Sequence, residues 1–216
     1  MLLCNDRDLN KNYPRFRTKD IFGINGVGEK QLIHPHFIKW HKWIINEYIP
    51  PSKRILVFIP CAAIKPYYNS PIHKEFNKII DKFPTHKVVI TNAGVIPYEF
   101  AGCYPFNSYD WNPVYETKNL KKKYIELTKR RISNYLNAHS QKYIGFVAYL
   151  NPISESLKAL EKVHINRENN IHIVKIDKIK LLPTSDFDLV LIYKKNLERL
   201  KKTLEIRRDG IISSKK

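Results

Sequence analysis

Short runs of apolar residues alternate in this chain with segments of helical periodicity, and this alternation constrains the fold more than any other feature. Four runs have the length of a strand, at residues 54–61, 86–94, 142–150 and 171–177. Continuous apolar runs of this length are typical of strands that are buried on both faces of a parallel sheet. The sequence therefore predicts an α/β fold of three layers, with helices on both faces of a mainly parallel sheet.

The segments between these runs predict the helices. Residues 36–48 place apolar side chains on one helical face, namely Phe37, Trp40, Ile44 and Tyr48. Periodicity and capping residues predict further helices at 70–83, 118–139, 151–163 and within 186–207. Residues 95–117 are aromatic and Pro-rich and are interpreted as one long loop, a kind of segment that is usually functional.

The domain organisation expected from these patterns is simple. We divide the chain into an N-terminal extension at 1–35, a core domain at 36–207 and a basic tail at 208–216. No signal peptide is apparent, and the apolar runs are shorter than the roughly 20 residues of a membrane span, so we expect a soluble, cytoplasmic protein that does not contact membranes. The three cysteines, Cys4, Cys61 and Cys103, lack metal-site spacing, so no metal is expected.

The formal net charge is +18 in 216 residues, which makes nucleic acid the first candidate partner. Residues 118–131 carry seven basic residues and one acid. Such a helix is often only a solvated surface, and a general enrichment in lysine would also raise the charge. The RNA-binding candidates are Lys121, Lys122, Lys123, Lys129, Arg130 and Arg131.

The densest group of reactive side chains follows the first apolar run. The segment PCAAIKPYYNSPIH, residues 60–73, contains a thiol, an ammonium, two phenols, hydroxyl and imidazole groups. Each has a structural interpretation: Cys61 as a buried thiol, Ser70 as a helix cap and His73 as a surface residue. Ligands of α/β folds bind beyond the carboxyl ends of the strands, and both this segment and residues 92–116 leave strand ends. We therefore expect the two loops to adjoin one pocket.

The order P-C-x3-K-P-Y-x2-S-x2-H is met in full by seven residues: Pro60, Cys61, Lys65, Pro66, Tyr67, Ser70 and His73. It resembles the signature of the archaeosine synthase alpha subunit family. The downstream loop resembles a second conserved loop of that family more loosely, through Gly94, Pro97, Glu99, Tyr104, Pro105, Tyr109 and Asp110. The resemblance covers roughly residues 50–200, the catalytic core of the family. Typical members also carry a transglycosylase-like region and a PUA domain, for which 216 residues leave no room.

The resemblance implies an archaeal tRNA-modifying enzyme with a fold like that of uracil-DNA glycosylase. Its substrate would be tRNA carrying 7-cyano-7-deazaguanine at position 15. Free L-lysine would be the co-substrate, adding its amine to the nitrile to give an amidine without any cofactor. A radical-SAM archaeosine synthase beta subunit would then act on the adduct. The implied partners are tRNA, that subunit, and a separate PUA or transglycosylase-like protein.

The resemblance also implies roles for individual residues. Cys61 is the candidate nucleophile toward the nitrile, and His73 or Tyr67 would deliver a proton to its nitrogen. Glu99 or Asp110 would hold the α-ammonium of lysine or deprotonate its amine. The assigned substrate-binding set is Tyr67, Ser70, Gly94, Glu99, Tyr104 and Tyr109, with Tyr104 and Tyr109 stacking on the deazaguanine. Lys65 is placed in the catalytic set, with phosphate or carboxylate binding as its other possible role.

Two other functions remain open from the residues. One is a base-recognising, glycosylase-like enzyme, which would need a water-activating acid in the first loop, where residues 60–68 have none. The other is a non-catalytic RNA-binding subunit, against which the complete set of thiol, ammonium, hydroxyl and imidazole groups argues. Mass spectrometry of tRNA incubated with the protein and lysine distinguishes these functions.

Overall fold

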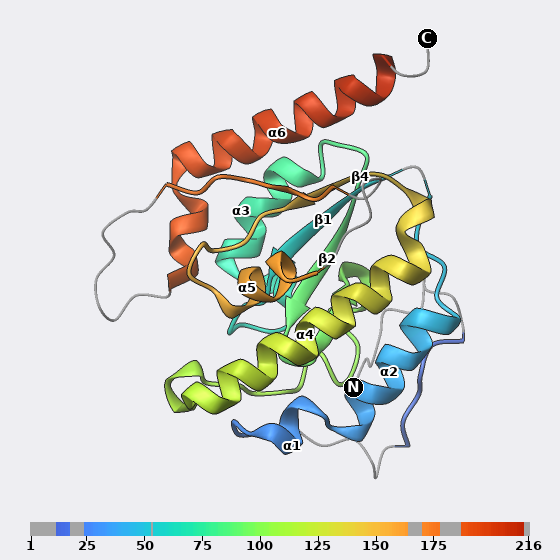
Figure 1. Ribbon diagram of the computed structural model, residues 1–216, viewed down its shortest axis with the longest axis vertical. Helices are drawn as coiled ribbons and strands as arrows, with labels where there is room; N and C mark the ends of the chain where they lie inside the picture. The colour runs from blue at the N-terminus through green and yellow to red at the C-terminus, as the bar shows by residue number, and fades with distance from the viewer. Residues whose placement is uncertain (1–11, 18–23, 53, 164–169, 178–186, 214–216) are drawn as a thin grey trace.

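A mostly parallel β-sheet forms the centre of the computed structural model, which describes residues 12–17, 24–52, 54–163, 170–177 and 187–213. Its strands lie in the order β3-β2-β1-β4-β5 (Figure 1). They are β1 (Arg54–Pro60), β2 (Thr85–Thr91), β3 (Gly94–Pro97), β4 (Tyr143–Ala148) and β5 (His172–Ile173). The pairs β1–β2, β1–β4 and β4–β5 are parallel, and β2–β3 is antiparallel.

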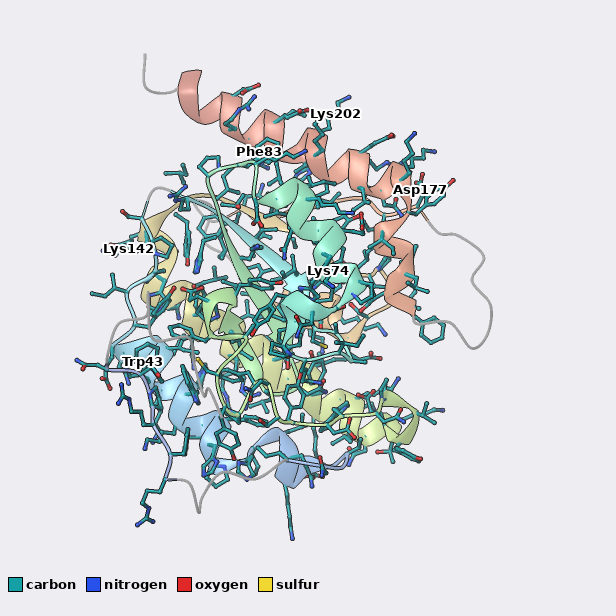
Figure 2. The ribbon with its side chains drawn as sticks, turned by 180° about the vertical axis from the view of Figure 1, so that it is seen from behind. Trp43, Lys74, Phe83, Lys142, Asp177 and Lys202 are labelled. Carbon is teal, nitrogen blue, oxygen red and sulfur yellow. The ribbon has the colours of Figure 1, made fainter. Side chains whose placement is uncertain are left out.

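Six α-helices are described around the sheet. They are α1 (Glu29–Leu32), α2 (Pro35–Asn46), α3 (Pro71–Ile80), α4 (Lys118–His139), α5 (Glu155–Glu161) and α6 (Lys194–Ser213). Figure 1 shows α2, α4 and α5 in front of the sheet, and Figure 2 shows the opposite face, covered by α3 with Lys74 and by α6 with Lys202. The three-layer α/β architecture with a mainly parallel sheet is therefore confirmed.

The alternation of side chains along β1 builds two separate cores. Leu56 and Phe58 point to one face and pack with α2, α4 and α5. Ile55, Val57 and Ile59 point to the other face and pack with α3 and α6. All five side chains have no exposed surface, as expected for a central strand covered by helices on both faces.

The structure differs from the sequence prediction in two places. Residues 94–97, expected in a loop, form β3, which pairs Gly94 with Thr91 and Pro97 with Val88. Because this pairing is antiparallel, the chain turns back along β2 instead of staying at the carboxyl edge of the sheet. Helix α6 continues to Ser213, so the expected basic tail is helical at residues 208–213.

Candidate functional site at the carboxyl edge of the sheet

The two loops that were expected to adjoin one pocket meet at the carboxyl ends of β1 and β2. The groove described below lies elsewhere, between α1 and α4. Cys61 is the residue directly after β1, is half-buried and is a reduced thiol. Tyr67, six residues further on, has a hydroxyl 2.8 Å from that of Tyr109 in the second loop. The structure therefore brings together parts of the chain that are 42 residues apart at this contact.

The Tyr67–Tyr109 contact continues into the sheet as a chain of hydroxyl groups. The Tyr109 hydroxyl lies 2.6 Å from Oγ1 of Thr91, the last residue of β2. Oγ1 of Thr91 also accepts a hydrogen bond of 3.0 Å from the backbone N–H of Ala93. Tyr67 and Thr91 have no exposed surface, and Tyr109 is 5% exposed. Sequence reasoning missed Thr91, although a polar residue that ends an apolar strand is a recognisable signal.

Lys65 places a charged group over this chain. Its Nζ lies 4.1 Å from the centroid of the Tyr109 ring, a cation–π geometry. Burial lowers the pKa of Lys65, while negative charge on Cys61 and on Asp110 acts in the opposite direction. Since this interaction is reciprocal, the Lys65 ammonium favours the thiolate of Cys61. Asp110, which is exposed, completes the group at the mouth of the site.

His73 lies behind Tyr67 and not on the protein surface. Its ring has no exposed surface and is stacked between Tyr67 and Tyr98, at centroid distances of 5.4 and 5.6 Å. Neither ring nitrogen has a hydrogen-bond partner of normal geometry in the described part of the chain, although the nearby Pro60 carbonyl favours protonation. Burial lowers its pKa to about 4, so the ring is neutral at pH 7. The position suits a residue that supports Tyr67.

Ser70 and Gly94 have backbone roles beside the site. Ser70 is buried at the N-cap of α3, where its carbonyl accepts the N–H of Lys74 while its side chain makes no capping hydrogen bond. Gly94 has φ +154°, a conformation that residues with a side chain rarely adopt, in the tight connection from β2 to β3. It thereby lets the chain reverse directly after Thr91.

Glu99 is not at the candidate site, which corrects the assignment made from sequence. The β3 pairing carries it to the amino end of β2, where its carboxylate accepts a hydrogen bond from the Tyr48 hydroxyl and contacts Nε2 of His86 at 3.2 Å. Nδ1 of His86 in turn lies 2.8 Å from the hydroxyl of Tyr143, at the start of β4. These contacts tie together helix α2 and the amino edge of the sheet, and so Glu99 has a structural role.

Tyr104 also lies away from the site. It is 3% exposed, its hydroxyl lies 2.8 Å from Nδ1 of His36, and its carbonyl accepts the indole N–H of Trp40. These contacts direct Tyr104 to helix α2, and the ring has no free face for stacking on a base. Of the two tyrosines expected to stack, only Tyr109 belongs to the site.

Helices α4 and α5 add polar groups that the sequence did not single out. The Tyr124 hydroxyl lies 2.7 Å from Oγ of Ser156, and negative charge on Cys61 is the second cause, after burial, that raises the pKa of Tyr124. Lys121 bridges Glu116 and Glu155 at 3.6 and 3.5 Å, so its charge is already paired.

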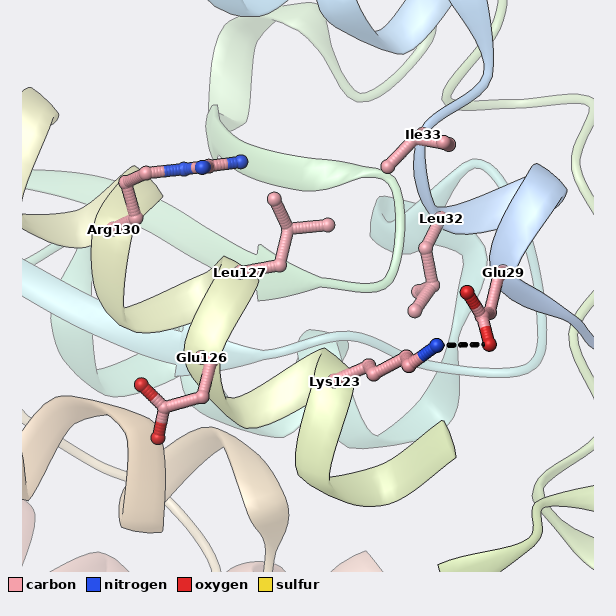
Figure 3. Close-up of a pocket in the computed structure, with 7 residues that line it drawn as sticks. All are labelled: Glu29, Leu32, Ile33, Lys123, Glu126, Leu127 and Arg130. Carbon is pink, nitrogen blue, oxygen red and sulfur yellow. Dashed lines mark hydrogen bonds and ion pairs between the residues drawn. The ribbon is translucent and has the colours of Figure 1, made fainter. Parts of the chain in front are cut away.

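The basic helix α4 presents a shallow groove with α1 (Figure 3). The groove encloses about 290 Å³ and is lined by Glu29, Leu32, Ile33, Lys123, Glu126, Leu127 and Arg130. Lys123 is ion-paired with Glu29 in this groove. Lys122 and Arg130 are exposed and Lys129 is half-buried. Among the described residues none of the three has an ion pair within 4 Å, so they are the cations best placed for phosphate.

Arg131 does not belong to the RNA-binding set. It is 3% exposed, and its guanidinium donates to the carbonyl of Leu32 at 2.8 Å and to that of Asn92 at 3.2 Å. Burial lowers its pKa to about 10, which leaves it charged at neutral pH. Arg131 therefore joins α1 and the β2–β3 connection to α4.

Neither a metal site nor a membrane span is found in the described ranges. No group of three or more His, Cys, Asp or Glu side chains within them could hold a metal ion. None of the helices found there combines the length and the apolar character that crossing a bilayer requires.

The comparison with known families then places the chain. The model of the domain of unknown function DUF5591 matches residues 37–185, more than half of the chain. The chain belongs to the DUF5591 family. A solved structure with a similar fold, that of AF0587, described as a protein of unknown function, has a TM-score of 0.51 at 16% identity. The match covers 76% of this chain and 49% of the AF0587 chain, and the similarity concerns the fold alone.

Curated relatives of this DUF5591 protein carry an archaeosine synthase name. The alpha subunit from Methanosarcina acetivorans is 29% identical over 105 residues, 47% of this chain and 16% of that protein. The alpha subunit from Thermoplasma acidophilum is 26% identical over 125 residues, 55% of this chain and 23% of that protein. Archaeosine synthase from Haloferax volcanii is 32% identical over 98 residues, covering 45% and 16%. The resemblance noted in the motif of residues 60–73 is confirmed, and the chain spans less than a quarter of each relative.

Proposed function

We propose that this DUF5591 protein acts in archaeosine formation on archaeal tRNA, as a transferase on the nitrile of 7-cyano-7-deazaguanine at position 15. The observation that carries the proposal is the joining of Cys61, Lys65 and Tyr67 of the signature motif to Tyr109 at one strand edge. The names of the curated relatives support the same pathway step. Because those relatives are much longer, the reaction at the nitrile is the part of their function that we assign to this chain.

The proposed reaction is the addition of the amine of free lysine to the nitrile carbon. The amine nitrogen forms a bond to that carbon, and one electron pair of the C≡N bond moves to the nitrile nitrogen. That nitrogen gains one proton and the amine nitrogen loses one, so the product is an amidine and nothing else is released. The balance requires no oxidant, reductant or nucleotide. A folded pocket contributes by holding the reactants together and by supplying a proton donor.

Cys61 provides a second route to the same product. Its thiolate, favoured by the Lys65 ammonium, adds to the nitrile carbon, and the nitrogen takes a proton to give a thioimidate. The lysine amine then attacks the same carbon, and the sulfur leaves with the electron pair of the C–S bond. Tyr67, on which the charge of Cys61 acts, is the proton donor in this arrangement, and Asp110 is the carboxylate available to the lysine α-ammonium. His73 supports Tyr67 from behind.

tRNA contact is assigned to the basic helix α4 beside this edge. Helix α4 starts at Lys118, and Lys121 in its first turn contacts Glu155 at the start of α5, which follows β4. The exposed cations Lys122, Lys129 and Arg130 would contact backbone phosphates. We further propose that a separate PUA or transglycosylase-like protein assists tRNA binding, that a radical-SAM beta subunit converts the adduct, and that the protein is cytoplasmic.

The proposal is tested by incubating the chain with tRNA that carries cyano-deazaguanine and with isotopically labelled lysine. Mass spectrometry of the digested nucleosides should show a deazaguanine whose mass has increased by one labelled lysine. A matched tRNA with guanine at position 15 is the control and should remain unlabelled. Release of a free base would support the glycosylase-like function, and binding without any change of mass would support the RNA-binding subunit.

A further inference from the structure

The buried hydroxyl cluster beside Cys61 is anchored at Thr91. A backbone N–H can only donate, so the 3.0 Å contact between Ala93 and Thr91 uses Oγ1 of Thr91 as an acceptor. Thr91 then has one proton to donate, and the hydroxyls that it contacts are those of Tyr109, at 2.6 Å, and of Tyr67. Thr91 has no exposed surface, so water offers no alternative. Thr91 therefore donates to one of these two tyrosines, whose own hydroxyls lie 2.8 Å apart.

The hydroxyl cluster lies beside Cys61. Negative charge on Cys61 acts on both Tyr67 and Tyr109. When the proton of Tyr67 points out of the cluster, a sulfur or a bound substrate can accept it, while Thr91 and Tyr109 stay hydrogen-bonded behind it.

The surroundings keep Tyr67 in its protonated form. Burial raises the pKa of Tyr67, and negative charge on Cys61 raises it further, while hydrogen bonds from Tyr109 and Thr91 oppose this effect. The ammonium of Lys65 above the Tyr109 ring also favours donation by the Tyr109 hydroxyl. Tyr67 is thus a neutral phenol that is hydrogen-bonded to Tyr109 and Thr91.

We propose that Thr91 is a positioning residue of this site, holding Tyr109 so that Tyr67 directs its proton toward the nitrogen of the bound nitrile. The inference rests on the proposed function and adds Thr91 to the residues of the motif. As the new bond forms at the nitrile carbon, the nitrogen takes the Tyr67 proton, and Tyr109 stabilises the resulting phenolate. The phenolate then recovers a proton from the attacking amine, so the amine proton ends on the nitrile nitrogen.

Thr91→Val tests this role because it keeps the shape of the side chain and removes only the hydroxyl. We expect kcat for lysine transfer to fall about 10- to 100-fold with KM nearly unchanged, part of the loss typical of a general acid. Thr91→Ser retains the hydroxyl and should remain within about 3-fold of the wild type. Tyr109→Phe interrupts the same chain at its middle and should reproduce the loss of kcat, which keeps the test valid if Thr91→Val fails to fold.

A double-mutant cycle with Tyr67→Phe separates this role from a structural one. Tyr67→Phe should cost about 100- to 10,000-fold in kcat, and adding Thr91→Val to it should cost nothing more. The inference is overturned if the losses of kcat multiply in the double mutant, or if Thr91→Val is as active as the wild type. Either result leaves the proposed function intact. A wild-type protein that transfers no lysine would overturn both.

Discussion

Replacing His73 by phenylalanine should reduce the loss in free energy of unfolding that this fold undergoes on acidification. The imidazole is fully buried between Tyr67 and Tyr98, and burial, together with the charge of Lys87, lowers its pKa to about 4. In the unfolded chain the same group titrates near 6.5. Phenylalanine retains a stacked ring in this position and does not titrate.

The size of the effect follows from proton linkage. Between the two pKa values of His73 the unfolded chain binds more protons than the folded one, so the free energy of unfolding rises with pH and falls as the solution is acidified. At about 1.4 kcal/mol per pKa unit, the contribution of His73 to the loss from pH 7 to pH 5 is about 2 kcal/mol. The loss is complete only below the folded-state pKa.

Urea denaturation at pH 7 and pH 5 measures this difference. The wild type should lose about 2 kcal/mol more than His73→Phe over this interval, because only the wild type titrates at this position. His172→Phe, at an exposed position of β5, is the matched control. Partial burial and the charge of Arg207 lower the pKa of His172 only modestly, so this variant should remove less of the acid sensitivity than His73→Phe. If His73→Phe loses as much stability on acidification as the wild type, His73 is not the buried neutral group described above.

Three further outcomes follow from the same structure. Glu99→Gln should destabilise the fold by about 1–3 kcal/mol in urea denaturation and leave the rate of lysine transfer unchanged. A large loss of rate would show that Glu99 takes part in the reaction. Arg131→Met should also cost about 1–3 kcal/mol, since it leaves two buried carbonyls without a donor, and an unchanged stability would contradict this. Replacing Lys122 and Lys129 by Gln should reduce the salt dependence of tRNA binding by up to about 0.9 in log–log slope per lysine, whereas Lys142→Gln, at the amino end of β4, should not.

The sequence predicted those parts of the fold that local periodicity determines. Helix α4 was expected at 118–139 and occupies Lys118–His139, because Thr117 caps it and its buried positions recur at helical spacing. The same spacing explains Arg131. It lies seven residues after buried Tyr124, two turns along the helix, and so faces the core in spite of its basic neighbours. Because Arg131 belongs to a run of basic residues, it was predicted to be an RNA-binding cation together with its neighbours.

The remaining errors come from tertiary pairing that no local pattern records. Residues 94–97 contain Gly94 and Pro97, which disfavour a strand assignment, and β3 forms only because β2 offers an edge to pair with. That pairing moves Glu99 to the far end of the sheet. His73 was predicted to be catalytic, with a surface position on a first helical turn as its structural interpretation. It is buried instead, because Tyr98 of the second loop packs on it. The motif located the Cys61 loop, and the fold decided which residues of the second loop meet it.

The rate of labelled-lysine transfer to cyano-deazaguanine tRNA by Cys61→Ala and Lys65→Ala tests the central claim most directly. Neither side chain belongs to the fully buried core, so both variants should fold and bind tRNA like the wild type. If the segment from Pro60 to His73 carries the chemistry through the thioimidate route, each substitution should slow transfer at least about 100-fold, whereas direct attack by lysine leaves Cys61→Ala active and Lys65→Ala slow. If both folded variants transfer lysine at the wild-type rate, the motif is structural and the account is contradicted.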